Sequence, residues 1–215
     1  MRDRCIFVCC ALGGASVAHA SIIGTTGAAM QIATPPDARL DVITSNSTIF
    51  VWNEDQNVLL GAPLAVNAVA SGFYNDASML VNTTIPAGRR IASHYIHFDA
   101  PPPESPSSAS GTVTFDADII GVIVLGDGGP TFLDDSDFLG SATLYSDAVA
   151  NRGMELSING EDFGISPSRR VLSFHLNVSI PGDFIRVITE PVPGPGVVTS
   201  LAGAAAILGA RRRRS

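Results

Sequence analysis

An acidic loop between residues 126 and 137 groups side chains that could bind a metal ion. The loop reads GDGGPTFLDDSD and contains Asp127, Asp134, Asp135 and Asp137. Calcium takes about six to eight oxygen ligands from carboxylates and carbonyls, often in loops of this kind. The loop lacks the ligand spacing of an EF-hand and contains no Gly-rich nonapeptide repeat. It is therefore a candidate calcium site, and a solvated acidic turn is the alternative interpretation.

Histidines and a carboxylate lie close together a little earlier in the chain. His94 and His97 stand three residues apart, which on a strand places them on opposite faces, so they cannot easily share a metal. His97 and Asp99 share a face, and such a pair could bind a metal or orient a base. We expect a structural, paired histidine instead. His175 falls on the polar side of its expected strand, where we expect it to be solvated.

Asp116 and Asp118 have the same strand parity, and two neighbouring carboxylates could act in glycoside hydrolysis. Little else supports that chemistry, because Trp52 is the single tryptophan and aromatic residues make up 7% of the chain. The sequence contains no G-x-S-x-G, H-E-x-x-H or phosphate-loop motif. We therefore expect a protein without enzymatic activity. A pocket that gathers Asp116, Asp118 and His97 would contradict this expectation.

Short β-type runs must position these side chains, because long helical periodicity is absent. We expect strands on either side of Asn53–Asn57, in residues 89–99, on either side of Asp116–Asp118, around Asn159–Gly160, and on either side of Pro181–Asp183. In residues 171–178 the apolar side chains alternate with polar ones, which is typical of a half-buried antiparallel strand.

Many short strands separated by Gly, Pro and Asn turns predict an all-β fold, an antiparallel β-sandwich or jelly-roll-like single domain. The Pro/Ser-rich stretch Asp99–Gly111 is expected to be a loop inside that domain. The stretch DDSDFLGSATLYSDAVANRG (residues 134–153) is expected to contain one short helical turn.

The composition restricts the class of partner. The chain has 215 residues, of which 46% are hydrophobic and 15% charged, enough for one domain with a substantial core. Lysine is absent, and between Ser21 and Glu190 there are 19 acidic residues against seven arginines. A body this acidic repels phosphate backbones, so we expect no nucleic acid partner. Metal cations or a hydrated matrix are more compatible with it.

The first 20 residues have the three parts of a secretory signal peptide. Two early arginines precede an apolar run over residues 5–17. The pattern Ala18-His19-Ala20 is accepted by signal peptidase and predicts cleavage before Ser21. All three cysteines lie in this segment, so the exported chain would be held together by core packing without disulfides. A buried N-terminal helix and a lipoprotein signal are the alternatives.

Residues 190–215 combine prolines, an apolar run and a cluster of arginines. The run VVTSLAGAAAILGA predicts a short hydrophobic helix that enters the membrane. It is followed by Arg211, Arg212, Arg213 and Arg214, which stay cytoplasmic by the positive-inside rule. The preceding EPVPGPG is extended because its prolines resist helix formation. Together with the signal peptide, this tail predicts a body outside the membrane.

The proline motif, short apolar helix and terminal arginines resemble the PEP-CTERM sorting domain of bacterial exosortase substrates. The family motif is Val-Pro-Glu-Pro, whereas this chain has Val192-Pro193-Gly194-Pro195, with glycine in place of glutamate. The resemblance implies that an exosortase-type enzyme cuts the tail near the prolines after a membrane-anchored intermediate. Residues 90–189 also resemble, in the order of runs such as HYIHFD and PGDFIRVIT, the secreted β-rich domains of such proteins. A C-terminal anchor that is never cut is the alternative.

The sequence thus predicts a signal peptide (1–20), a secreted β-sandwich domain (21–189) and a PEP-CTERM-like segment (190–215). The expected function is that of an exported structural or interaction protein of the cell envelope or extracellular matrix. A carbohydrate-binding module with an exopolysaccharide partner is the alternative. Exposure of Tyr74, Tyr95 and Tyr145 along one groove would favour that alternative. No cofactor other than calcium is expected.

Overall fold

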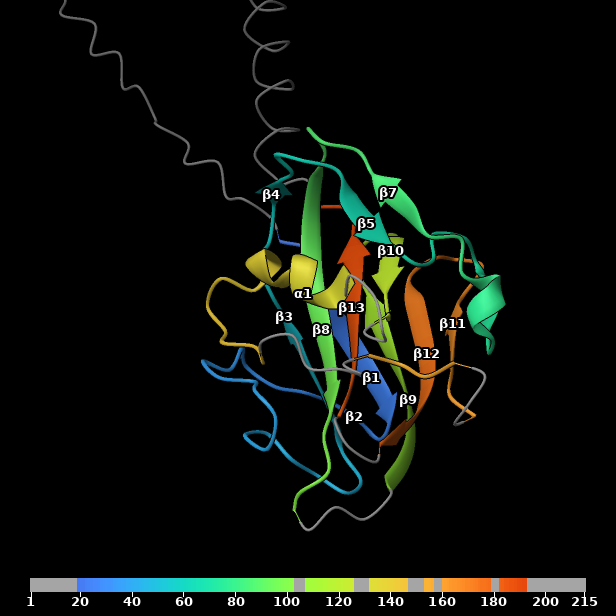
Figure 1. Cartoon of the computed structure of the whole chain (residues 1–215). Helices are drawn as coiled ribbons and strands as arrows, with labels where there is room; N and C mark the ends of the chain where they lie inside the picture. Colours follow the sequence, from blue (N-terminus) through green and yellow to red (C-terminus); the bar gives the residue numbers. More distant parts are fainter. Residues whose placement is uncertain are drawn as a thin grey trace, which may run out of the picture. The chain divides into compact units, whose positions relative to one another are not determined.

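The computed structural model describes residues 19–102, 107–125, 132–146, 153–156, 160–178 and 182–192. Within these ranges the regular secondary structure is mostly β-strand, with only three short helical turns, which confirms the all-β prediction (Figure 1). His19–Val192 forms one compact unit. The expected C-terminal helix, and the expected signal peptide apart from its last two residues, lie outside the described ranges.

The first sheet joins strands that are far apart in the sequence. In the described part of the chain its order is β1 (Ile22–Gly27), β9 (Ser107–Phe115), β12 (Val171–Val178), β11 (Asp162–Ile165) and β6 (Gly72–Tyr74). All of these pairings are antiparallel. The alternation expected in β12 is confirmed, because Leu172, Phe174 and Leu176 are buried while the residues between them remain partly exposed.

The second sheet is centred on two long strands that are buried along almost their whole length. Among the described residues its order is β10 (Ile119–Ile123), β13 (Asp183–Thr189), β8 (Arg90–Phe98), β3 (Ile49–Asn53) and β2 (Ala29–Gln31), with β4 (Val58–Leu59) also on β8. The pairing of β2 with β3 is parallel and the others are antiparallel. The antiparallel prediction therefore holds with this exception.

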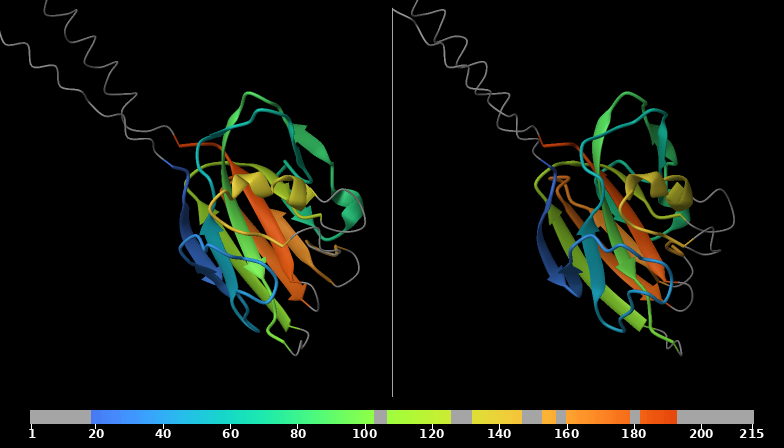
Figure 2. Two further views of the ribbon diagram at one scale, coloured as in Figure 1. Left: turned by 60° about the vertical axis from the view of Figure 1, so that its left-hand side comes forward. Right: turned by 90° about the vertical axis from the view of Figure 1, so that its left-hand side faces the viewer.

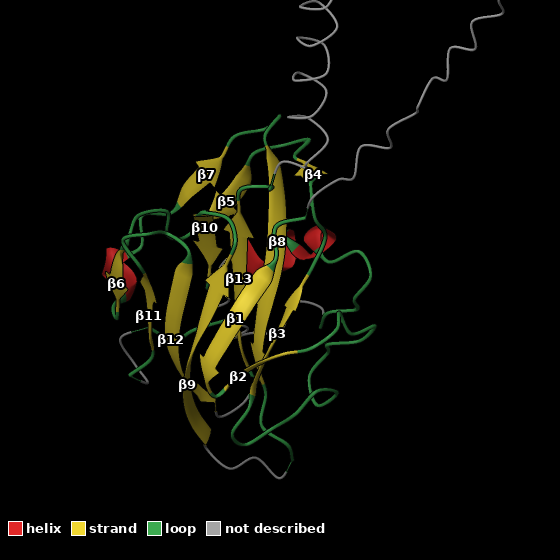
Figure 3. Cartoon of the chain, turned by 180° about the vertical axis from the view of Figure 1, so that it is seen from behind, coloured by secondary structure: helices red, strands yellow, loops and turns green. Residues whose placement is uncertain are grey.

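Smaller elements complete the fold. The strands β5 (Leu64–Val66) and β7 (Thr83–Ile85) pair with each other. The helical turns are η1 (Ala77–Met79), α1 (Phe132–Asp135) and η2 (Asp137–Leu139). Figure 3 shows that the helices are single turns beside a structure dominated by strands. The short helical turn expected within residues 134–153 is confirmed by η2, and α1 overlaps the start of that stretch.

Two apolar layers explain why β8 and β13 are buried on both faces. One layer lies between the sheets and includes Val113 and Leu176 from the first sheet and Ile96 and Val187 from the second. The other includes Trp52, Tyr95 and Phe184 on the opposite face of the second sheet. The α1–η2 segment and the β5–β7 pair lie over that face (Figure 2). A strand covered on both sides carries apolar residues at successive positions rather than in simple alternation.

The Pro/Ser-rich loop is shorter than the sequence predicts. β9 begins at Ser107, so the part of Asp99–Gly111 from Ser107 onward belongs to a strand. This segment pairs with β12 from Phe174 to Val178, which satisfies its backbone groups. Gly111 permits the close packing, because a Cβ there would lie 2.9 Å from the Cβ of Ala29. The small residues of this stretch led to the prediction of a loop. From Ser107 onward they instead allow close packing within a sheet.

A fully buried ion pair fixes the second sheet to its covering segment. Arg186 of β13 and Glu54, just after β3, are both 0% exposed at their side chains. Arg186 Nε donates to Glu54 Oε2 at 2.8 Å and its Nη2 donates to Oε1 at 2.8 Å. Two parallel hydrogen bonds of this kind give an arginine–carboxylate pair both strength and a fixed orientation.

The remaining donors of Arg186 reach the α1–η2 segment. Its Nη1 donates to the carbonyl of Leu133 at 2.9 Å and to Ser136 Oγ, and its Nη2 donates to Asp137 Oδ1 at 3.0 Å. The guanidinium also lies over the ring of Tyr95, 4.9 Å from its centroid. Because a buried guanidinium is costly unless its donors are paired, these contacts determine where the segment sits.

The ion pair leads to a prediction about stability. Glu54→Gln removes the fully buried counter-charge of Arg186 and leaves it only the partly exposed Asp137, so we expect the free energy of unfolding to fall by about 3–5 kcal/mol. The exposed pair Arg39–Asp37 provides the control, since Arg39→Ala should cost less than about 1 kcal/mol. Urea denaturation of the full chain measures both. Equal effects of the two changes would show that the buried pair does not hold the cover in place.

Candidate functional site

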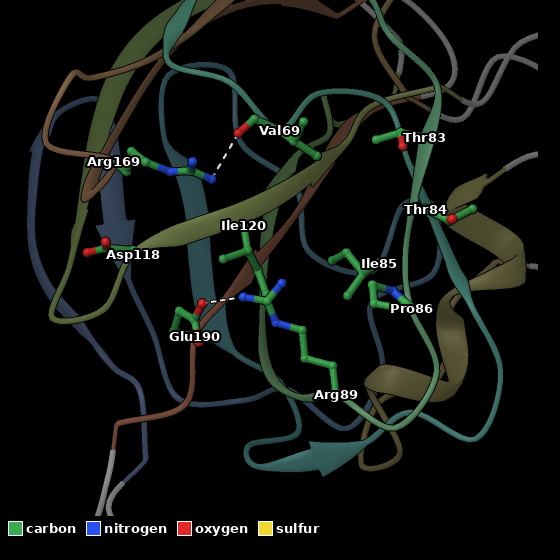
Figure 4. A pocket seen from close by; sticks show the side chains of 10 residues that line it. All are labelled: Val69, Thr83, Thr84, Ile85, Pro86, Arg89, Asp118, Ile120, Arg169 and Glu190. Atoms are coloured by element: carbon green, nitrogen blue, oxygen red, sulfur yellow. Dashed lines mark hydrogen bonds and ion pairs between the residues drawn. The ribbon is translucent and has the colours of Figure 1, made fainter.

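A pocket of about 410 Å³ opens between the β5–β7 pair and the β10 edge of the second sheet (Figure 4). Its walls combine apolar side chains with two arginines and two carboxylates. The lining residues are Val69, Thr83, Thr84, Ile85, Pro86, Arg89, Asp118, Ile120, Arg169 and Glu190.

The charged groups of this pocket are bound to other parts of the fold. Arg169 donates to the carbonyl of Val69 at 2.9 Å and to the carbonyl of Ile119 at 2.7 Å. Arg89 forms an ion pair with Glu190 across the pocket. These contacts hold the β5–β7 pair and the end of β13 in place. The arginines, carboxylates and threonine hydroxyls of the lining could hydrogen-bond a small polar molecule.

A second hollow lies on the outer face of the first sheet. It is lined by Thr26, Gly27, Ser110, Gly111, Thr112, Asp162, Ser173, Phe174 and His175, and its volume is about 580 Å³. Hydroxyl groups dominate its polar surface, and Ser110 Oγ lies 2.7 Å from His175 Nδ1. His175 was expected to be solvated, and it instead lies partly buried among these hydroxyls. Burial raises the pKa of Asp162 in the same hollow.

An exposed aromatic ring borders the second hollow. Phe73 of β6 is 57% exposed. It lies beside Ser173 across Gly164, since a Cβ at Gly164 would meet Ser173 Oγ at 2.8 Å and Phe73 Cδ2 at 3.7 Å. The sequence analysis did not single out Phe73. Its place on the outer face follows from the pairing of β6 with β11, which depends on contacts between distant segments.

The histidines of β8 have structural roles. His94 is fully buried, with Nδ1 2.8 Å from Asn53 Oδ1 and Nε2 3.1 Å from Thr189 Oγ1. His97 donates from Nε2 to the carbonyl of Ile43 at 2.8 Å, because a carbonyl can only accept. The expectation of structural rather than catalytic histidines is consistent with these contacts.

Asp99 holds the same loop as His97. Its Oδ2 accepts from the backbone N–H of Asp41 at 2.7 Å, and Asp41 adopts a positive φ of 64°. The Asp99 carboxylate therefore has a structural role, because its hydrogen bond stabilises this unusual backbone conformation. His97, near the end of β8, and Asp99, just after it, therefore both anchor the segment before β3.

The three residues that would revive an enzymatic interpretation do not gather. His97 pairs with Phe184 at one end of β13, whereas the carbonyl of Asp118 accepts from Glu190 N–H at 2.9 Å, just beyond the other end. Six residues of strand separate these points by about 20 Å. Asp116 accepts from the backbone N–H of Ser21 at 2.7 Å.

The acidic loop proposed for calcium is described only in part. Asp127 lies outside the described residues. Asp134 and Asp135 belong to α1, and Asp137 forms an ion pair with Arg186 at 3.0 Å. Calcium binding at this loop stays a prediction, with Asp137 already engaged by a cation.

A different carboxylate group comes together in the described part of the chain. One ligand atom each from Glu155, Glu161 and Asp183 lie within 4.8 Å of one another. Burial and the neighbouring Glu161 and Glu155 raise the pKa of Asp183 well above its usual range. No sequence pattern predicts this group, because its members come from three separate segments and no local spacing connects them.

The three tyrosines considered for glycan binding do not line one exposed groove. Tyr74 is buried and stacks on Phe163 with ring centroids 4.7 Å apart. Tyr95 is buried beneath the α1–η2 segment, and the hydroxyl of Tyr145 donates to Glu54. Their burial counts against a stacking platform made from these tyrosines.

The residues expected to carry the export and sorting signals lie largely outside the described ranges. These are Ala18, Pro193, Gly194, Pro195 and the arginines from Arg211 to Arg214. Ala20 and Val192, at the two ends of the described unit, belong to one small apolar cluster with Ala92 and Ala117. In the described ranges the helices are turns of three or four residues, too short to cross a membrane.

Comparison of the chain with models of protein families, with curated proteins and with solved structures gives no match.

The environment of His94 predicts how stability depends on pH. Burial lowers its pKa from 6.5 to about 3, so below pH 6.5 the unfolded chain binds a proton that the folded chain does not. Between pH 7 and pH 5 this single histidine should reduce the free energy of unfolding by about 2 kcal/mol. Urea denaturation at both pH values should show that His94→Gln removes this part of the pH dependence. An unchanged pH dependence in the variant would contradict the assignment.

Proposed function

We propose that this chain is an exported protein with a jelly-roll-like β-sandwich body. In this proposal the body acts as a structural or interaction component of the cell envelope or extracellular matrix. Residues 1–20 direct export, and residues 190–215 anchor the chain in the membrane. An exosortase-type enzyme then recognises Val192-Pro193-Gly194-Pro195 and transfers the body to the cell surface or extracellular space.

The contact of Ser21 with Asp116 is the observation that carries the proposal. The backbone nitrogen of Ser21 lies 2.7 Å from Asp116 Oδ1. Cleavage before Ser21 converts that amide into a positively charged α-amino group beside a carboxylate. The neutral hydrogen bond then becomes a charge-assisted one, which is stronger. The position where the signal pattern ends is therefore a position where a new N-terminus would be stabilised by the fold.

The meeting of the two ends of the body also supports the proposal. Ala20 and Val192 pack in one cluster, so the segment leading to the tail leaves the body beside the N-terminal end. Of the side chains singled out in the sequence, those of His94, His97 and Asp99 serve the fold, which suits a display role better than catalysis.

Terminus mapping tests this proposal. The full chain should be produced in a bacterium that has an exosortase-type enzyme and in the same strain without it, and both ends mapped by mass spectrometry. We expect a start at Ser21 in both strains and an end near Pro193 in the first. Replacing Arg211–Arg214 with glutamines should prevent the second cut.

An intact arginine cluster in the membrane fraction of the enzyme-containing strain would contradict sorting. A start at Met1 in both strains would contradict export.

Carbohydrate binding is the alternative function, and the second hollow favours it. Hydroxyl groups, Asp162 and His175 could hydrogen-bond a sugar, and the exposed ring of Phe73 beside them could stack on its apolar face.

Affinity electrophoresis in gels containing an exopolysaccharide tests the alternative. We expect retardation of the full chain that Phe73→Ala and His175→Ala reduce at least about threefold. Phe138→Ala removes an equally exposed ring on η2 and should leave the retardation unchanged. Equal migration with and without polysaccharide would exclude this function for that polymer.

A further inference from the structure

The carboxylates of Glu155, Glu161 and Asp183 come from parts of the fold that are remote in sequence. Glu155 lies in the described segment 153–156, Glu161 immediately precedes β11 of the first sheet, and Asp183 begins β13 of the second sheet. Their ligand atoms lie within 4.8 Å of one another. A group bound to all three would therefore connect the two sheets at one end of the body.

Two members of the cluster are removed from water. Glu161 and Asp183 are each 1% exposed. Buried carboxylates are normally paired with a cation or hydrogen-bonded at both oxygens. Neither residue forms an ion pair with the described part of the chain. Two adjacent buried carboxylates without a cation are an unfavourable arrangement.

The hydrogen bonds leave one oxygen without a partner. Glu161 Oε1 accepts from the backbone N–H of Asn177 at 2.9 Å, and its Oε2 accepts from the backbone N–H of Glu155 at 2.5 Å. These bonds orient the Glu161 carboxylate. Asp183 Oδ2 is buried and has no hydrogen-bond partner in the described structure. A cation bound within this group of three carboxylates would satisfy the buried oxygen that has no hydrogen-bond partner.

We propose that Glu155, Glu161 and Asp183 form a binding site for a calcium ion that ties the two sheets together. The ligand atoms are all oxygens, which suits a hard cation. Histidine and cysteine, the usual ligands of zinc, are absent from the group. Calcium tolerates irregular geometry and incomplete protein ligation, whereas magnesium requires a near-ideal octahedron. This site differs from the acidic loop at residues 126–137 and does not depend on the proposed function.

The position of the site indicates what the ion does. The chain has no cysteine beyond Cys10, so no disulfide can connect the sheets of the body. A calcium ion held by Glu161 and Asp183 joins β11 to β13, and Glu155 adds the segment before β11. Binding to the folded chain alone raises its stability according to the concentration of free calcium.

Calcium titration of the full chain tests the site. The protein is stripped with EDTA, desalted and titrated with calcium chloride by calorimetry, and its melting temperature (Tm) is measured in parallel. We expect one ion per chain and an increase in Tm of about 5–10 °C at a calcium concentration a hundredfold above Kd. Magnesium chloride at the same ionic strength should give a smaller increase, which controls for screening of the acidic surface.

Matched variants locate the site. Asp183→Asn keeps the shape of the side chain but removes its charge, and it should weaken calcium binding at least tenfold. Without calcium this variant should melt at or above the temperature of the stripped wild type, because a like-charge contact is removed. Glu155→Gln, at a more exposed ligand, provides a second test in case Asp183→Asn fails to fold. Asp162→Asn changes the adjacent acidic residue, whose side chain points to the opposite face of β11, and should bind like the wild type.

Three results would overturn the proposal. One is the absence of binding heat and of any change in Tm at about 10 mM calcium chloride, roughly ten times the weakest Kd of extracellular calcium modules. Another is full retention of binding by both Asp183→Asn and Glu155→Gln. The third is an equal loss of binding in Asp162→Asn, which would indicate diffuse attraction to the acidic surface.

Discussion

The pairing of Arg186 with Glu54 is the interaction on which the arrangement of the second sheet and its cover depends. A guanidinium that is completely removed from water must find acceptors for its donors, and here they come from three separate places. Glu54 follows β3, Leu133 lies in α1 and Asp137 in η2. Moving any of these segments away would leave a donor of the buried guanidinium without an acceptor. The cover over Tyr95 and Phe184 is therefore positioned by electrostatics as well as by apolar contact.

Other polar side chains also hold neighbouring segments in place through hydrogen bonds to the backbone. Asn67 Oδ1 accepts from the backbone N–H groups of Val124 and Leu125 at 2.8 and 3.0 Å, which fixes the chain after β10. Arg169 adopts a positive φ of 58° and binds two carbonyls across the pocket. In a body without cysteine, such contacts do part of the work that disulfides do in disulfide-bonded domains. The proposed calcium ion would add one more connection between the sheets.

The sequence predicts the strands better than it predicts their partners. Alternation in β12, the break around Asp116–Asp118 and the turn before β13 are local patterns, and the structure has strands where each of them indicates. The start of β9 at Ser107 was missed, because small and polar residues there are stabilised by pairing with β12 rather than by their own propensity. Local pattern also gave no sign that β8 is covered on both faces, since that depends on the distant α1–η2 segment.

Candidate sites were harder to predict for the same reason. His97 and Asp99 were recognised as neighbours on one face, and their partners turn out to be backbone groups of the segment around Asp41. Asp137 was grouped with its sequence neighbours, whereas its contact is with Arg186 on another strand. Glu161 and Asp183 meet only because the two sheets are joined at that end of the body. Sequence spacing can indicate a site within one segment, but it cannot indicate a site whose residues come from several segments.

Native-state hydrogen exchange of the full chain, followed by mass spectrometry, tests most directly whether the Arg186–Glu54 pair anchors the fold. If it does, the amides of β8 and β13 and those of the α1–η2 segment should exchange together and among the slowest in the body. The edge strand β6, with its exposed Phe73, should exchange much earlier. Rapid exchange of α1–η2 while β13 remains protected would contradict the account, because the cover would then open without the sheet that the arginine ties it to.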